Sequence, residues 1–95
     1  MRTENEVVQS LKAGREVFED YMAVYRGRLR GLMEQTADFF SDLITCVRAG
    51  IMDPAEIDDA LRYACDGIYR MNSLPSNEEI GAWERVWKEV LKVYG

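Results

Sequence analysis

Histidine is absent from this chain of 95 residues. Imidazole is the side chain whose ordinary pKa lies nearest to neutrality, and it is also the commonest ligand for metal ions in proteins. Its absence excludes catalytic triads that contain histidine, zinc sites that use it, and the acid–base chemistry that depends on it. From the sequence we expect neither a metal ion nor another cofactor.

Proline and cysteine are scarce, with two of each. Cys46 and Cys65 lie at unequal distances from a turn near Gly50, an offset that separates them by roughly 12 Å along two antiparallel helices. A disulfide needs a much shorter separation, so we expect two free thiols packed in the core.

Long apolar runs are missing as well, since none approaches the roughly 18 residues that cross a membrane. The first residues lack the basic and then apolar order of a secretory signal, and we therefore expect a cytoplasmic protein that contacts no membrane. A formal net charge of −5 repels phosphate and disfavours nucleic acid as a partner. With 47% hydrophobic and 31% charged residues, the composition is typical of one globular domain over residues 1–95.

Three segments have the spacing of a capping box, in which a short polar residue precedes a glutamate by three positions. These segments are Thr3–Glu6, Asp53–Glu56 and Ser76–Glu79. Three starts predict an all-α fold of three antiparallel helices, over about residues 4–49, 54–71 and 77–94.

The first predicted helix is much longer than the other two and contains Gly27 and Gly31. Each glycine costs about 1 kcal/mol relative to alanine inside a helix. The apolar stripe nevertheless keeps its phase across them, because Tyr25, Leu29 and Leu32 fall on one face. We therefore expect a continuous first helix, and the alternative is a four-helix up-down bundle split near Gly27–Gly31.

A continuous helix of this length would extend beyond the two helices that fold back on it, which leaves its N-terminal half uncovered. An apolar stripe of this size is too large to face water on a stable monomer. We therefore expect a homodimer through this half of the helix. The stripe consists of Val7, Leu11, Phe18, Tyr21, Met22 and Tyr25, with Ala13, Val17 and Val24 beside it.

Positive charge is concentrated at Arg26, Arg28 and Arg30. Arginine suits bidentate contacts with carboxylates and phosphates, so these residues are candidates for binding an acidic partner, an anion or nucleic acid. Ordinary surface ion pairing is the simpler interpretation, because Arg30 precedes Glu34 by four positions. Tyr63, on the polar side of the second predicted helix, is a further candidate contact with a protein partner.

Acidic side chains gather in two places. The group at the start of the second predicted helix has the placement that the helix dipole stabilises, and its spacing differs from that of a calcium loop. The other pair, Asp38 and Asp42, indicates a solvated face or a contact with a partner. The first group consists of Asp53, Glu56, Asp58 and Asp59.

A long helix followed by two shorter ones resembles the plan of the all-helical chorismate mutases, which are intertwined dimers. The resemblance is confined to architecture. The site of that family requires a lysine and several arginines along its first two helices, whereas no lysine lies between Lys12 and Lys88 here.

The sequence leads us to expect a small acidic helical module that binds protein without catalysis, as an adaptor, an assembly chaperone or an inhibitor, and that self-associates. Two alternatives stay open. One is a nucleic-acid or anion-binding protein that uses the three arginines, and the other is a small all-helical enzyme.

Overall fold

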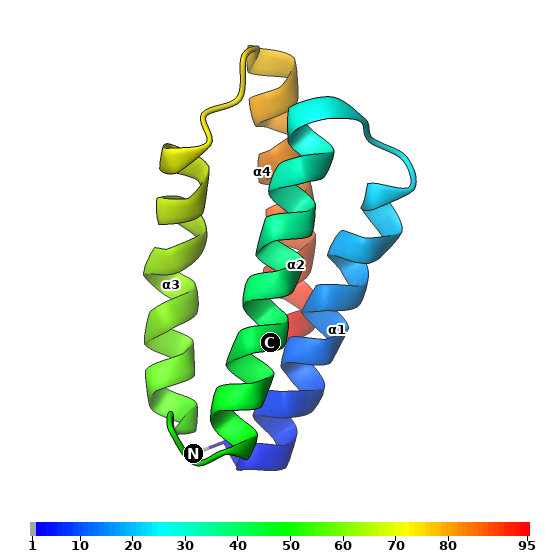
Figure 1. The fold of residues 1–95 in the computed structure, drawn as a ribbon. Helices are drawn as coiled ribbons and strands as arrows, with labels where there is room; N and C mark the ends of the chain where they lie inside the picture. Colours follow the sequence, from blue (N-terminus) through cyan, green and yellow to red (C-terminus); the bar gives the residue numbers. More distant parts are fainter. Residues whose placement is uncertain (1) are drawn as a thin grey trace.

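The protein is an all-α bundle of four helices, described for residues 2–95, apart from the side chain of Cys65, by a computed structural model. The helices run alternately up and down, and Figure 1 shows α2 standing between α1 and α3 with α4 behind it. Their bounds are α1 Glu4–Met22, α2 Gly27–Arg48, α3 Pro54–Met71 and α4 Asn77–Tyr94.

The expected continuous helix over residues 4–49 is wrong, and the chain follows the four-helix alternative. The break lies at residues 23–26, between the end of α1 and the start of α2. Gly27 has a φ of +67°, in the left-handed region that residues with a Cβ rarely adopt. The resemblance to the plan of the chorismate mutases disappears with the long helix on which it depended.

Side chains fix three of the four helix starts. The hydroxyls of Thr3 and Ser76 accept hydrogen bonds from the third residue of α1 and of α4, as the capping spacing predicts. Asp53 and Glu56 form a complete capping box at α3, followed by Pro54 in the first turn. These starts confirm the predicted beginnings of three helices at residues 4, 54 and 77.

Aromatic rings from three helices form the centre of the core. The fully buried ring of Phe18 stacks on Trp83 and Trp87 of α4, with centroids 5.7 Å and 5.8 Å away. Phe40 of α2 meets the same ring edge-on at 5.6 Å. Offset-stacked and edge-on pairs of this kind are the favoured arrangements of aromatic side chains. Helix α1 thus packs against α2 and α4 together.

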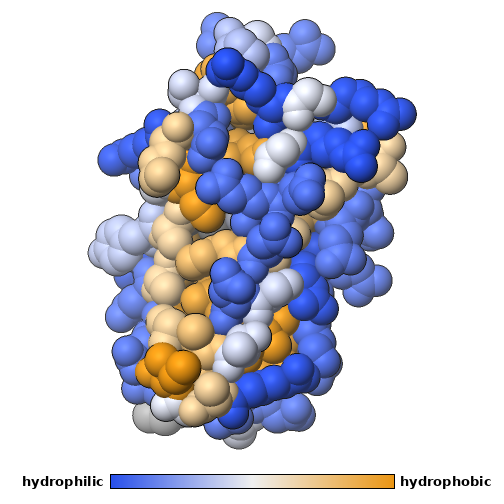
Figure 2. Space-filling model, viewed as in Figure 1, coloured by the Kyte–Doolittle hydropathy of each residue, from blue (hydrophilic) through white to orange (hydrophobic). Residues whose placement is uncertain are grey.

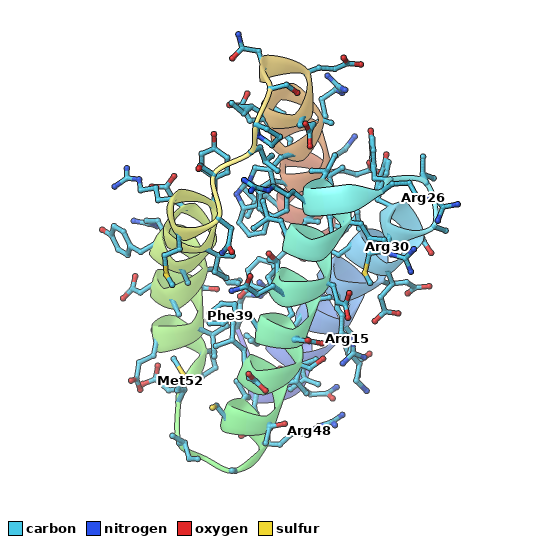
Figure 3. All side chains as sticks on the ribbon, turned by 45° about the horizontal axis from the view of Figure 1, so that its top comes forward. Arg15, Arg26, Arg30, Phe39, Arg48 and Met52 are labelled. Carbon is cyan, nitrogen blue, oxygen red and sulfur yellow. The ribbon has the colours of Figure 1, made fainter. Side chains whose placement is uncertain are left out.

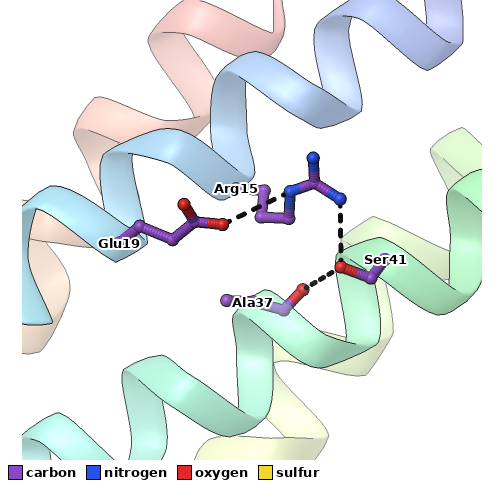
Figure 4. Close-up of polar contacts among 4 residues, drawn as sticks. All are labelled: Arg15, Glu19, Ala37 and Ser41. Atoms are coloured by element: carbon purple, nitrogen blue, oxygen red, sulfur yellow. Dashed lines mark hydrogen bonds and ion pairs between the residues drawn. The ribbon is translucent and has the colours of Figure 1, made fainter.

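A polar contact joins α1 to α2 on the solvent side of the bundle (Figure 4). Nη1 of Arg15 donates a hydrogen bond to Oγ of Ser41 at 3.1 Å, and its Nε lies 3.4 Å from a carboxylate oxygen of Glu19. The Ser41 hydroxyl donates in turn to the carbonyl of Ala37. These contacts fix Arg15 across the seam between the two helices.

Helix α3 contributes less to the core than its neighbours. Among the described side chains of α3, Ile57 and Leu61 are buried, and both lie in its first half. Ala60, Ala64 and Ile68 are half-buried. Its main contacts are with α2. Within residues 2–95, no helix has the length and apolar character needed to span a bilayer.

Candidate protein-binding surface

The apolar stripe of α1 lies inside the bundle. Val7, Leu11 and Phe18 have no exposed surface, because the break at residues 23–26 lets α2 fold back along α1 and α4 covers the remaining side. The prediction that these three residues contact another chain is wrong. The expected homodimer through this stripe therefore loses its basis, since water does not reach these side chains.

The rest of the predicted stripe lies near the upper end of the bundle. Val17, Tyr21 and Tyr25 are half-buried against the core, and Val24 in the turn is 67% exposed. The Tyr21 hydroxyl donates a hydrogen bond of 2.6 Å to Glu89 of α4. That hydrogen bond and the negative charge of Glu89 raise the pKa of Tyr21 above its usual range.

The three arginines do not converge on one site. Arg28 lines a hollow of about 480 Å³ with residues from the end of α3, while Arg26 lines a different one beside Glu78 and Glu79. Arg30 is exposed on the side of α2 that faces α1 (Figure 3). Because Arg26 precedes the helix, it does not share a helical face with Arg30. Among the described residues, no ion pair joins Arg30 to Glu34.

Tyr63 is exposed, as predicted, with 73% of its surface accessible. It borders a shallow hollow of about 520 Å³ that follows α3 from its first turn to its middle. We call this feature the α3 hollow. Its lining residues are Met52, Glu56, Asp59, Ala60, Tyr63 and Ala64.

Apolar side chains continue around the α3 hollow. Figure 2 shows apolar residues gathered along α3, beside a hydrophilic line over α2. Phe39 lies between α2 and α3, and Met52 lies at the start of α3 (Figure 3). Ile51 is 70% exposed and Met71 82% exposed at the two ends of the helix. Exposed apolar side chains gathered along one helix, with polar residues beside them, are typical of a site for association.

The floor of the α3 hollow was not predicted from the sequence. Ala60 and Ala64 had the spacing of a small-residue flank on which another helix can pack closely. The structure leaves that flank at the surface, because α3 turns other residues, Ile57 and Leu61, toward the bundle. The spacing of Ala60 and Ala64 was therefore the feature of the sequence that could have indicated this surface.

Tyr94 of α4 contacts the side of α3 that lies away from the α3 hollow. Its ring is buried, its hydroxyl donates a hydrogen bond to Asp58, and the Arg2 guanidinium lies 4.7 Å from the ring centroid. Burial and the carboxylate of Asp58 raise the pKa of Tyr94 above its usual range. These contacts attach α3 to α4 and have a structural role.

The thiol of Cys46 is free and half-buried, and the prediction for Cys65 falls on a side chain outside the described part of the chain. No group of three or more metal-ligating side chains occurs among the described residues. Comparisons with family models, with curated proteins and with solved structures find no match to this chain.

Proposed function

We propose that this protein is a non-catalytic protein-binding module and that the α3 hollow is its binding surface. The observation that carries the proposal is the exposed aromatic ring of Tyr63 beside an apolar floor that no helix within residues 2–95 covers. Aromatic residues are enriched in protein interfaces, where they anchor the contact. An adaptor, an assembly chaperone or an inhibitor would use such a surface.

The shape of the α3 hollow supports a macromolecular partner over a small ligand. Sites for small molecules are concave and bury most of the ligand, whereas this hollow is shallow and open along one side of a helix. A partner that covers Met52, Ala60 and Ala64 would remove their apolar surface from water. Removing apolar surface from water is a favourable contribution to association.

The alternative of nucleic-acid or anion binding has less support. Arg26 and Arg28 line different hollows and Arg30 lines neither of them, so no one hollow offers all three arginines to a phosphate. Bidentate recognition of an anion requires donors that converge.

The proposal is tested by comparing three forms of the full chain as bait in an extract of its host cells. The forms are the wild type, Tyr63→Ala and, as a matched control, Val24→Ala. Val24 is similarly exposed but lies in the turn between α1 and α2. We expect a specific protein to be retained by the wild type and the control and lost with Tyr63→Ala.

The retained protein is then purified and titrated against the same three forms by isothermal calorimetry. We expect Tyr63→Ala to weaken its binding by a factor of about ten or more, the effect of removing an interface anchor. Equal affinity for all three forms would show that the partner binds elsewhere and would contradict the assignment of the α3 hollow.

A further inference from the structure

Carboxylates of α3 line the α3 hollow, and the neighbouring helix α2 has exposed carboxylates as well. Glu56 and Asp59 line the hollow directly from α3. On α2, Asp42 comes three residues after Phe39, whose ring lies between the two helices, and is exposed on the neighbouring face with Asp38 one turn before it. Among the described residues, none of these four carboxylates forms an ion pair.

The nearby cations do not line the α3 hollow. Arg62 of α3 lines the hollows between α3 and α4, and Arg70 pairs with Asp66 at 2.9 Å. Arg48 extends from α2 on the side of α1 (Figure 3). Among the described residues, no lysine or arginine lines the α3 hollow, so the charge of its lining is negative, and such a surface attracts cationic partners.

The form of the α3 hollow fits a helix. Its apolar floor begins at Met52, just before α3, and continues along the helix to Ala64, and the helical part from Pro54 is roughly 15 Å long at 1.5 Å for each residue. Ala60 and Ala64 have small side chains, which permit a short distance between the axes of two packed helices. A helix of about three to four turns, with one apolar face, would cover this floor.

We propose that the occupant of the α3 hollow is a basic amphipathic helix of a partner protein. Its apolar face packs on Met52, Ala60 and Ala64 beside Tyr63, and its lysines or arginines face the carboxylates of α2 and α3. This inference rests on the proposed function and specifies the chemistry of the partner. The negative charge of the surface favours a basic helix as the occupant over a second copy of this chain, because the chain is itself acidic.

The test uses two fluorescent helical peptides of about 14 residues with the same apolar face of leucines. The first has lysines on its polar face, and the second has glutamates at the same positions. Binding to the full chain is followed by fluorescence anisotropy. We expect the lysine peptide to bind with an affinity that falls as salt increases from about 50 to about 300 mM, and the glutamate peptide to bind at least tenfold more weakly.

Matched variants locate the binding site. Asp59→Lys reverses a charge at the α3 hollow. Asp20→Lys makes the same change at an exposed position of α1, away from the hollow. We expect Asp59→Lys to weaken binding of the lysine peptide about fivefold at low salt and Asp20→Lys to have less than half that effect. Tyr63→Ala should weaken binding about tenfold, and Val24→Ala should leave it unchanged. Circular dichroism verifies that each variant is folded.

Three outcomes would overturn the inference. These are equal binding of the two peptides, equal effects of Asp59→Lys and Asp20→Lys, and a wild-type dimer that Tyr63→Ala dissociates. The proposed function fails separately, if a native partner binds Tyr63→Ala with the same affinity as it binds the wild type. A partner that depends on Tyr63 but offers an acidic or neutral helix would preserve the function and overturn the inference alone.

Discussion

Gly14 lies where α1 crosses both α2 and α4, and it is buried. A Cβ added there would lie 2.8 Å from Cε2 of Phe40 and 3.2 Å from Cγ1 of Val90. The first distance is too short for an ordinary contact, and the Phe40 ring is held in the core by Phe18 and Trp87. The missing side chain at this position therefore allows the three helices to approach one another.

We expect Gly14→Ala to lower the free energy of unfolding by about 1–2 kcal/mol. Overpacking costs about 1–3 kcal/mol, and the higher helix propensity of alanine offsets up to about 1 kcal/mol of it. Gly67→Ala on α3 is the control, because no atom lies within 4 Å of its added Cβ. Urea denaturation should show Gly67→Ala at or above wild-type stability, and a stable Gly14→Ala would contradict the packing described here.

Tyr94 makes stability depend on pH at the alkaline end. Its pKa in the folded chain is raised above the ordinary value of 10.0, so above that pH the unfolded chain has lost a proton that the folded chain keeps. Stability is therefore fully present below pH 10 and falls as the pH rises beyond it. Tyr21, whose pKa is also raised, contributes in the same direction.

We expect Tyr94→Phe to cost about 1–2 kcal/mol at neutral pH, because the hydrogen bond to Asp58 is lost. The cost should shrink as the pH rises above about 10, because the wild type loses stability there through ionisation of this phenol in the unfolded chain, and the variant has no such phenol. Chemical denaturation at a series of pH values measures both effects. A variant whose stability falls with pH as steeply as that of the wild type would show that Tyr94 has no part in the dependence.

At the scale of the element, two glycines of α2 that look equivalent in the sequence have different roles in the structure. Gly27 has a positive φ, whereas Gly31 lies inside α2 with no atom within 4 Å of an added Cβ. We expect Gly27→Ala to destabilise the protein by about 1–2 kcal/mol, the cost of a left-handed conformation. Gly31→Ala should stabilise it by up to about 1 kcal/mol.

Thermal melts of the two single variants, compared with the wild type, measure these opposite signs. Stabilisation by both substitutions would indicate a continuous helix across residues 23–26. The double variant is less informative, because the two effects partly cancel.

Helix α3 should open more easily than the other helices. None of the described side chains in its second half, residues 62–71, is buried, whereas α2 buries nine residues along its length. Few buried contacts lower the free energy of local opening. We expect hydrogen exchange followed by mass spectrometry to show the fastest exchange among helix interiors at residues 62–71. Slower exchange there than in α2 would contradict this expectation.

The beginnings of α1, α3 and α4 could be predicted because a local side chain marks each of them, at Thr3, Asp53 and Ser76. The beginning of α2 has no such mark, since Arg26 occupies the N-cap position and makes no capping hydrogen bond. The periodicity of apolar residues did not indicate the break at residues 23–26 either. Tyr25 lies within the break and Leu29 just after it, and both pack on the same core, so the apolar phase continues while the chain reverses.

At the scale of the whole molecule, folding α2 back along α1 satisfies the apolar stripe within one chain. We therefore expect a monomer of 11.0 kDa at micromolar concentration, measured by sedimentation equilibrium. Val7, Leu11 and Phe18, the residues that favoured a dimer, are fully buried without a second copy. A mass near twice this value would show that another surface of the molecule self-associates.

Much of the candidate surface depends on the arrangement of the helices and was beyond the reach of the sequence. Tyr63 could be predicted, because its angle on the helix opposes the core stripe. Ala60 and Ala64 fall on the border of that stripe, where the position of the neighbouring helix decides between core and surface. That position is set by contacts between distant residues, which periodicity does not encode.

The proximity of Arg2 to the ring of Tyr94 has a consequence for the order of the helices along the chain. The two ends of the described chain border one hollow, so a short linker between them would make the fold nearly circular. The chain could then be reopened in the connection between α3 and α4, which gives the order α4, α1, α2, α3 with the same pairs in contact. Such a permuted protein would bring α4 next to α1 in sequence and make their pairing local, and local pairing speeds folding.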